Sequence, residues 1–323
     1  MRRRRRSRPA FVHRRMQIPR ALASPASLKG VLSAVDAARA LAEGLSSWAQ
    51  ADALPVADGG EGTLDVIHAA LGGEWRETAV HDAFGSERRA RWLARDDDAF
   101  VEAAEAIPLD PERLDPLAAS SRGLGEVIAA VGKPRSLFVF LGGTATVDGG
   151  AGLREVIRHL PAPTIVLCDV DVPLVDAARI FAAQKGATPN QALELERRLA
   201  AMQELHDVRS LAGAGAAGGL GAALAALGAS LAPAADWVLD RIGFDPSAYD
   251  LVVTGEGTVD ATTMRGKAPG TVARRCERAD TRCVLFGGRV LDAPTGVETV
   301  ALSGEPGRAR EDLVELGASL GPR

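Results

Sequence analysis

Short apolar runs alternate with segments of helical periodicity along most of this 323-residue chain. After residue 30, for example, Val35, Leu41 and Leu45 fall on one face of a helical pattern. The strand-like runs are at residues 137–141, 164–170, 250–254, 283–286 and 297–303. Strands that alternate with helices are typical of α/β proteins with parallel sheets. We therefore predict an α/β fold.

Residues 74–104 show a different pattern, because apolar and polar side chains alternate there around turn signals at residues 84–86 and 95–98. This two-residue period predicts an antiparallel ribbon instead of a βαβ unit. The chain length and its 46% hydrophobic residues allow two domains. We predict a parallel-sheet domain from residues 16–73 and 246–323, with a mixed-sheet α/β domain inserted at 74–245.

The charge is distributed unevenly. The chain has 38 Lys and Arg and 42 Asp and Glu, and eight of the arginines lie within residues 1–15. The remainder is therefore strongly acidic, which argues against nucleic-acid binding. The tail itself would suit a nucleic-acid or membrane-surface arm. We expect instead that translation starts at Met16, because a strand-like run follows it directly.

Targeting signals are missing from the sequence. No apolar segment follows the arginines as in a secretory signal, and no run of 18 apolar residues could span a membrane. Cys168, Cys276 and Cys283 are odd in number and lack a C-x-x-C spacing, which predicts reduced thiols. We expect a cytoplasmic protein with no membrane partner, and the sequence leaves a homo-oligomer open.

Glycines and acids gather where the apolar runs end. Four loops share this composition: residues 55–63, 141–152, 168–174 and 254–260. In open α/β sheets, ligands bind at the carboxyl ends of strands, where backbone amides and helix N-termini face anions. Carboxylates in the same loops are suited to a divalent cation. The pattern predicts a joint anion and metal site, and turn chemistry is the alternative for any single loop.

Other motifs are weaker. Residues 213–218 fit the dinucleotide fingerprint G-x-G-x-x-G, but no convincing strand precedes them. Close helix packing, or a helix N-terminus that faces phosphate, is the better interpretation. No Walker A loop is present, and no G-x-S-x-G elbow supports a hydrolase triad. Arg122 and Lys185 each lie beside a glycine, so each is either a solvated cation or a group that grips a carboxylate or phosphate.

Taken together, these stretches resemble the bacterial type-1 glycerate kinases. The similar segments follow the family's order, at residues 26–34, 55–63, 120–126, 142–152, 168–174, 184–187, 213–224 and 252–273. The resemblance implies phosphorylation of D-glycerate by ATP with Mg²⁺, and 2-phosphoglycerate is the favoured product. It also implies a Rossmann-like (flavodoxin-like) domain beside a second α/β domain, with the active site in the cleft between them.

The resemblance also implies roles for particular residues. Asp169 and Lys267 match the family's proposed catalytic Asp and Lys, which would orient the attacking hydroxyl and offset charge on the transferred phosphate. Substrate or phosphate binding is expected of Ser27, Lys29, Arg122, Gly142, Gly143, Thr144, Lys185, Gly215, Gly218 and Gly255. Binding of Mg²⁺ or its waters is expected of Asp58, Glu61, Asp148, Glu256 and Asp260.

Three polar residues of the family pattern are lost. Ala26 replaces an Asp of the first loop, Val147 an Asn of the glycine loop, and Val172 an Asn after the strand that ends near Asp169. These losses keep two other hypotheses open. The chain would then be a nucleotide-binding or regulatory homologue with impaired catalysis, or a kinase for another small hydroxy acid.

Overall fold

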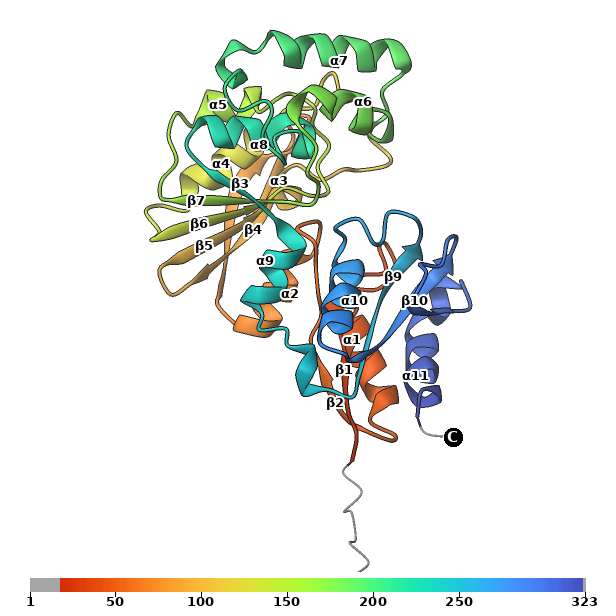
Figure 1. The fold of residues 1–323 in the computed structure, drawn as a ribbon. Coiled ribbons are helices and arrows are strands. Elements are labelled where there is room, and N and C mark those ends of the chain that lie inside the picture. Colours follow the sequence, from red (N-terminus) through yellow and green to blue (C-terminus); the bar gives the residue numbers. More distant parts are fainter. Residues whose placement is uncertain (1–17, 322–323) are drawn as a thin grey trace, which may run out of the picture.

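The computed structural model describes residues 18–321, so the basic tail at 1–15 lies outside the described residues. Two β-sheets dominate the fold (Figure 1). The strands of the first sheet are β1 (Arg20–Ala23), β2 (Gln50–Ala53), β9 (Leu251–Val259), β10 (Arg282–Val290) and β11 (Glu298–Ala301). All of them pair in parallel, in the order β11-β10-β9-β1-β2. Counted along the chain this is the order 2-1-3-4-5 of flavodoxin-like sheets.

Helices cover both faces of this parallel sheet. Along β1, Ala21 and Ala23 face the core formed with α1 (Ala34–Leu45) and α11 (Ala309–Ser319). Leu22, between them, faces the opposite core, which includes α10 (Ala268–Arg278). Successive side chains of a strand point to opposite faces, so an all-apolar strand is what a doubly covered sheet requires.

The second sheet is mixed. Its strands, in spatial order, are β3 (Glu74–His81), β4 (Glu87–Arg95), β5 (Asp98–Glu102), β6 (Ser136–Phe140), β7 (Thr164–Cys168) and β8 (Ser230–Pro233). The strands from β3 to β5 are antiparallel and those from β5 to β8 are parallel. The predicted α/β fold with a parallel sheet and a second, mixed sheet is confirmed, as is the antiparallel ribbon within residues 74–104. The domain boundaries stay predictions.

The helices of the mixed sheet lie in two layers. On the outer face, α4 (Arg122–Ala130) and α8 (Ala216–Ala226) pack over the sheet, and α7 (Pro189–Ala201) lies farther out (Figure 1). On the inner face, α2 (Thr63–Leu71) and α9 (Ala234–Arg241) lie between the two sheets. The remaining helices are α3 (Ala103–Ala106), α5 (Ala151–Val156) and α6 (Ala177–Phe181). No helix among residues 18–321 is long and apolar enough to cross a membrane.

Helices α1 and α11 approach so closely that their backbones nearly touch. A Cβ atom built on Gly44 would lie 2.1 Å from the carbonyl oxygen of Val314, and one on Gly317 would lie 2.6 Å from that of Leu41. No side chain fits in such gaps, so glycine is required at both positions.

We expect Gly44→Ala to lower the free energy of unfolding by about 1–3 kcal/mol, because the methyl group must push α11 away. Alanine is normally more favourable than glycine inside a helix. A loss of stability in Gly44→Ala would therefore come from the contact with α11. Gly307→Ala is the matched control, since a Cβ there meets nothing within 4 Å. Urea unfolding of both variants measures the difference, and a Gly44→Ala protein as stable as the control would contradict this packing.

Candidate active site

A cleft of about 1350 Å³ lies where the carboxyl edges of the two sheets meet. The parallel sheet contributes the loops that follow β1 and β9, which are neighbouring strands. Their connecting helices, α1 and α10, lie on opposite faces of the sheet. This is the topological switch point, the usual ligand site of an open α/β sheet. The mixed sheet contributes the ends of β5, β6 and β7.

The structure brings most of the predicted site residues together in this cleft. Its lining includes Ser27, Lys29, Asp58, Glu61, Gly142, Gly143, Thr144, Asp169, Lys185, Glu256, Asp260 and Lys267. They come from loops more than 200 residues apart in sequence, and only the fold makes them neighbours. Arg122, Asp148, Gly215, Gly218 and Gly255 are not part of the lining.

Two glycine loops touch at the base of the cleft. The amide of Gly142 donates to the carbonyl of Gly59 at 2.9 Å, and a Cβ on Gly142 would lie 2.6 Å from the Cα of Gly60. The next residues leave polar groups for a ligand. Thr144 is only 2% exposed, yet its hydroxyl oxygen has no hydrogen-bond partner among residues 18–321. A buried hydroxyl without a protein partner is costly, so this group is suited to donate to a ligand.

The mixed-sheet wall holds an acid and a base. Burial raises the pKa of Asp169, directly after β7, to about 6, and the charge of Asp58 adds to the shift. Lys185 is 4% exposed and donates to the carbonyl of Thr146 at 2.7 Å. Burial lowers the pKa of its ammonium to about 8, although the charges of Asp169 and Asp148 oppose this shift. Near pH 7 the wall therefore presents a carboxylate beside a buried cation.

The parallel-sheet wall holds Lys267. This residue is the N-cap of α10, and its ammonium lies 3.2 Å from Glu256 and 4.0 Å from Asp260. Burial raises the pKa of Glu256, although Thr263 donates a hydrogen bond to its carboxylate at 2.7 Å. An ammonium at a helix N-terminus adds to the positive end of the helix dipole, so this wall is suited to an anion.

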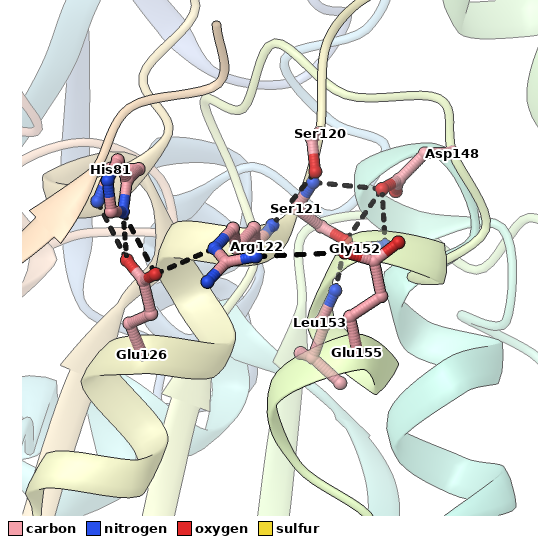
Figure 2. A network of polar contacts seen from close by, with 9 residues as sticks. All are labelled: His81, Ser120, Ser121, Arg122, Glu126, Asp148, Gly152, Leu153 and Glu155. Atoms are coloured by element: carbon pink, nitrogen blue, oxygen red, sulfur yellow. Dashed lines mark hydrogen bonds and ion pairs between the residues drawn. The ribbon is translucent and has the colours of Figure 1, made fainter. Parts of the chain in front are cut away.

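The carboxylate of Asp148 is occupied by hydrogen bonds to residues outside the cleft lining. This carboxylate accepts hydrogen bonds from the amide and hydroxyl of Ser121, both at 2.8 Å, and from the amide of Gly152 at 3.1 Å (Figure 2). It also accepts the amide of Gly150 at 3.0 Å. Four donors use the oxygens that a metal ion would need. The geometry therefore favours a structural role, in which Asp148 ties the start of α4 to the start of α5.

Arg122 lies outside the cleft lining. Its guanidinium lies 2.9 Å from Glu126 and 3.9 Å from Glu155, and half of its side chain is exposed (Figure 2). These contacts favour a solvated cation at the start of α4 over a group that grips a substrate carboxylate or phosphate. Arg122 is therefore not part of the site proposed below.

The remaining three predicted glycines permit close backbone packing outside the cleft. A Cβ on Gly215 would lie 2.6 Å from the carbonyl oxygen of Pro173. On Gly218 it would lie 2.1 Å from that of Thr146, and on Gly255 2.3 Å from that of Phe286. No strand directly precedes residues 213–218, so the structural context of a dinucleotide fingerprint is absent there.

Comparison with known proteins identifies the family. The model of the glycerate kinase family matches residues 21–160 and 158–304, which is most of the chain. This chain belongs to the glycerate kinase family. Glycerate 2-kinase of Escherichia coli K12 is 34% identical, with 83% of this chain and 85% of that protein covered. Glycerate kinase of Bacillus subtilis 168 is 32% identical, with 83% and 84% covered.

A solved structure has the same architecture. It is that of a protein provisionally named glycerate kinase 2, from Salmonella typhimurium LT2, which is 29% identical to this chain. The two superpose with a TM-score of 0.77 over 94% of this chain and 97% of that one. The predicted resemblance to glycerate kinases and the predicted enzyme class are therefore confirmed.

The magnesium ion that the sequence resemblance implies would find few preformed ligands in the cleft. Among residues 18–321 no group of three or more Asp, Glu, His or Cys side chains is arranged to hold a metal ion. Asp58 nevertheless lies close enough to Asp169 and Glu256 to raise the pKa of both carboxyls. Magnesium commonly uses only one or two carboxylates together with phosphate oxygens, so the residues present are compatible with it.

Several cleft residues were missed by sequence reasoning. They are Arg88, Arg91, Glu102, Glu105 and Arg289, which lie in or beside strands and belong to no motif. Glu102 is buried, and its two oxygens accept the amides of Gly62 and Leu64 at the start of α2, at 3.0 and 3.1 Å. Burial raises the pKa of this carboxyl to about 8. Only the register of β4 and β5 could have indicated that Arg88, Arg91 and Glu102 reach the cleft.

We expect Thr144→Val to leave the free energy of unfolding unchanged or higher, because the deleted hydroxyl has no partner to lose. The same change should lower kcat/KM if the hydroxyl binds a ligand. Thr254→Val is the matched control, since its buried hydroxyl donates to the carbonyl of Ser24 at 2.7 Å. That variant should lose about 1 kcal/mol of stability. Thermal unfolding and steady-state kinetics measure both effects; equal losses of stability would contradict the unpartnered hydroxyl.

Proposed function

We propose that this protein transfers a phosphoryl group from ATP to D-glycerate, with 2-phosphoglycerate as the product, in the cleft between the two sheets. Membership of the glycerate kinase family supports the reaction, and the Escherichia coli relative is named for the 2-position. The observation that carries the proposal is the pair of facing walls. Asp169 and Lys185 line one of them, and Lys267 lines the other.

Asp169 would accept the proton of the attacking hydroxyl. Its pKa of about 6 leaves it ionised near pH 7 but still basic enough to bind that proton. The buried ammonium of Lys185 beside it would hold the carboxylate in place and offset negative charge on the transferred group. The hydroxyl of Thr144, which lacks a partner, would donate to a ligand oxygen.

Lys267 would act on the phosphate side. Its ammonium is now 3.2 Å from Glu256, and an incoming phosphate would offer it a second anionic partner. Asp58 and Glu256 are the residues that would hold Mg²⁺ together with phosphate oxygens, where the ion would neutralise charge on the phosphates. Two further cations of the cleft, Lys29 and Arg289, add positive charge to the same wall.

We expect Lys267→Ala and Asp169→Asn each to lower kcat by about 10²- to 10³-fold, the usual effect of losing one electrostatic contact to a transition state. Lys133→Ala is the control, because this lysine is exposed and is not part of the cleft lining. ADP release with D-glycerate and with L-glycerate measures turnover, and ³¹P NMR of the product identifies the phosphorylated hydroxyl.

These variants also separate the alternatives. ATP binding without glycerate-dependent ADP release in the unaltered protein would favour a regulatory homologue. Faster turnover of another hydroxy acid would change the substrate but keep the mechanism. A Lys267→Ala enzyme with most of its turnover would contradict the role of that lysine.

The pH dependence follows from the two shifted groups on the mixed-sheet wall. Asp169 must lose its proton to act as a base, so kcat/KM should rise as the pH increases through about 6. Lys185 must keep its proton to oppose negative charge, so kcat/KM should fall above about pH 8. Lys185→Met should remove the alkaline limb and keep the acid limb. A profile that is flat between pH 5 and 9 would contradict both assignments.

A further inference from the structure

We infer that Arg88 binds the carboxylate of the hydroxy-acid substrate. This inference rests on the proposed function, because it assigns the group that recognises the acid end of the molecule to be phosphorylated. Arg88 lies near the start of β4 and lines the cleft.

Arg88 differs from three comparable arginines, because its guanidinium forms no ion pair within residues 18–321. Four arginines have a buried Nε atom without a hydrogen-bond partner: Arg20, Arg88, Arg154 and Arg241. Three of them pair their terminal nitrogens with carboxylates, on Asp52, Glu204 and Asp98. Within residues 18–321, no carboxylate forms an ion pair with Arg88. A partly buried guanidinium with no anion beside it is costly, and a bound anion would remove that cost.

The strand register places Arg88 at the edge of the mixed sheet where β5 ends and the cleft begins. Because β4 is antiparallel to β5 and Trp92 pairs with Val101, Arg88 lies beyond the carboxyl end of β5. Pro108 and Leu109 also line the cleft. They are attached to the glycine loop, since Leu109 donates to the carbonyl of Gly143 at 2.8 Å and Pro108 forms a β-bridge with Thr144.

The spacing suits a three-carbon acid. Arg88 on β4 and Asp169 after β7 are three strand positions apart in the mixed sheet, roughly 14 Å between strand axes. A long arginine side chain and a short aspartate would reach inward from the two ends of this span. A small hydroxy acid between them would place its carboxylate at Arg88 and its hydroxyl at Asp169.

The other cations of this wall are already engaged. Arg91 lies 2.6 Å from Glu105 and 3.4 Å from Asp65, and its guanidinium stacks 4.6 Å from the centre of the Trp75 ring. Lys185 lies beside Asp169, at the hydroxyl end. Arg88 is therefore the wall's cation that is left for a substrate carboxylate, and its planar fork matches the two oxygens of that group.

The test compares Arg88→Gln and Arg88→Lys with Arg89→Gln. Arg89 is the next residue of the same strand, 68% exposed and 2.6 Å from Glu77, so its replacement removes the same charge outside the cleft. We expect Arg88→Gln to raise the KM for D-glycerate by about 10- to 100-fold and to leave the KM for ATP unchanged. Arg88→Lys should fall between the two, because lysine keeps the charge but not the fork. Arg89→Gln should behave like the unaltered protein.

Calorimetric titration with D-glycerate alone separates this inference from the proposed reaction. Glycerate binding that depends on Arg88, in a protein without turnover, would overturn the proposed function and support the inference. Normal turnover in Arg88→Gln, or an equal rise in both KM values, would overturn the inference and leave the function standing. A protein that neither binds nor phosphorylates glycerate would overturn both.

Discussion

The apolar layer between the two sheets determines where every cleft residue lies. Leu22 and Val252 enter this layer from the parallel sheet, and Phe100 and Phe138 enter it from the mixed sheet. Helices α2, α9 and α10 fill the space between them (Figure 1). Close packing makes such a layer stiff, so the carboxyl edges of both sheets are held at a fixed separation. The loops at those edges can differ in sequence, because they supply the functional side chains while the apolar layer sets the distance between the walls.

Each wall of the cleft places a lysine beside a carboxylate. Lys267 pairs with Glu256 on the parallel-sheet wall, and Lys185 lies beside Asp169 on the mixed-sheet wall. Burial still makes each charge costly, as the raised pKa of Asp169 and the lowered pKa of Lys185 indicate. Asp58 adds repulsion toward both walls. These buried charges lower the free energy of unfolding of the ligand-free protein. A bound ligand with charges complementary to both walls reduces that cost.

The sequence predicted the fold well because apolar strands and their terminal loops are local features. It predicted the cleft positions of Asp169 and Lys267 for the same reason, since each follows directly from a strand end or a helix start. It did not predict that Arg122 and Asp148 would lie outside the cleft lining, because a glycine next to a charged residue does not determine which partners that side chain finds. Arg88 was missed because its place depends on the register between β4 and β5, which is not a local property.

The three departures from the family pattern have unequal consequences once they are located. Val147 is 1% exposed and packs in the core with Leu174 and Leu199, so valine is the more compatible residue there and an amide would need a buried partner. Val172 acts through its backbone, whose carbonyl accepts the amide of Gly215 at 2.8 Å. Ala26 alone of the three lines the cleft. The case for impaired catalysis from three lost polar groups therefore reduces to one position, on the wall opposite Asp169, Lys185 and Arg88.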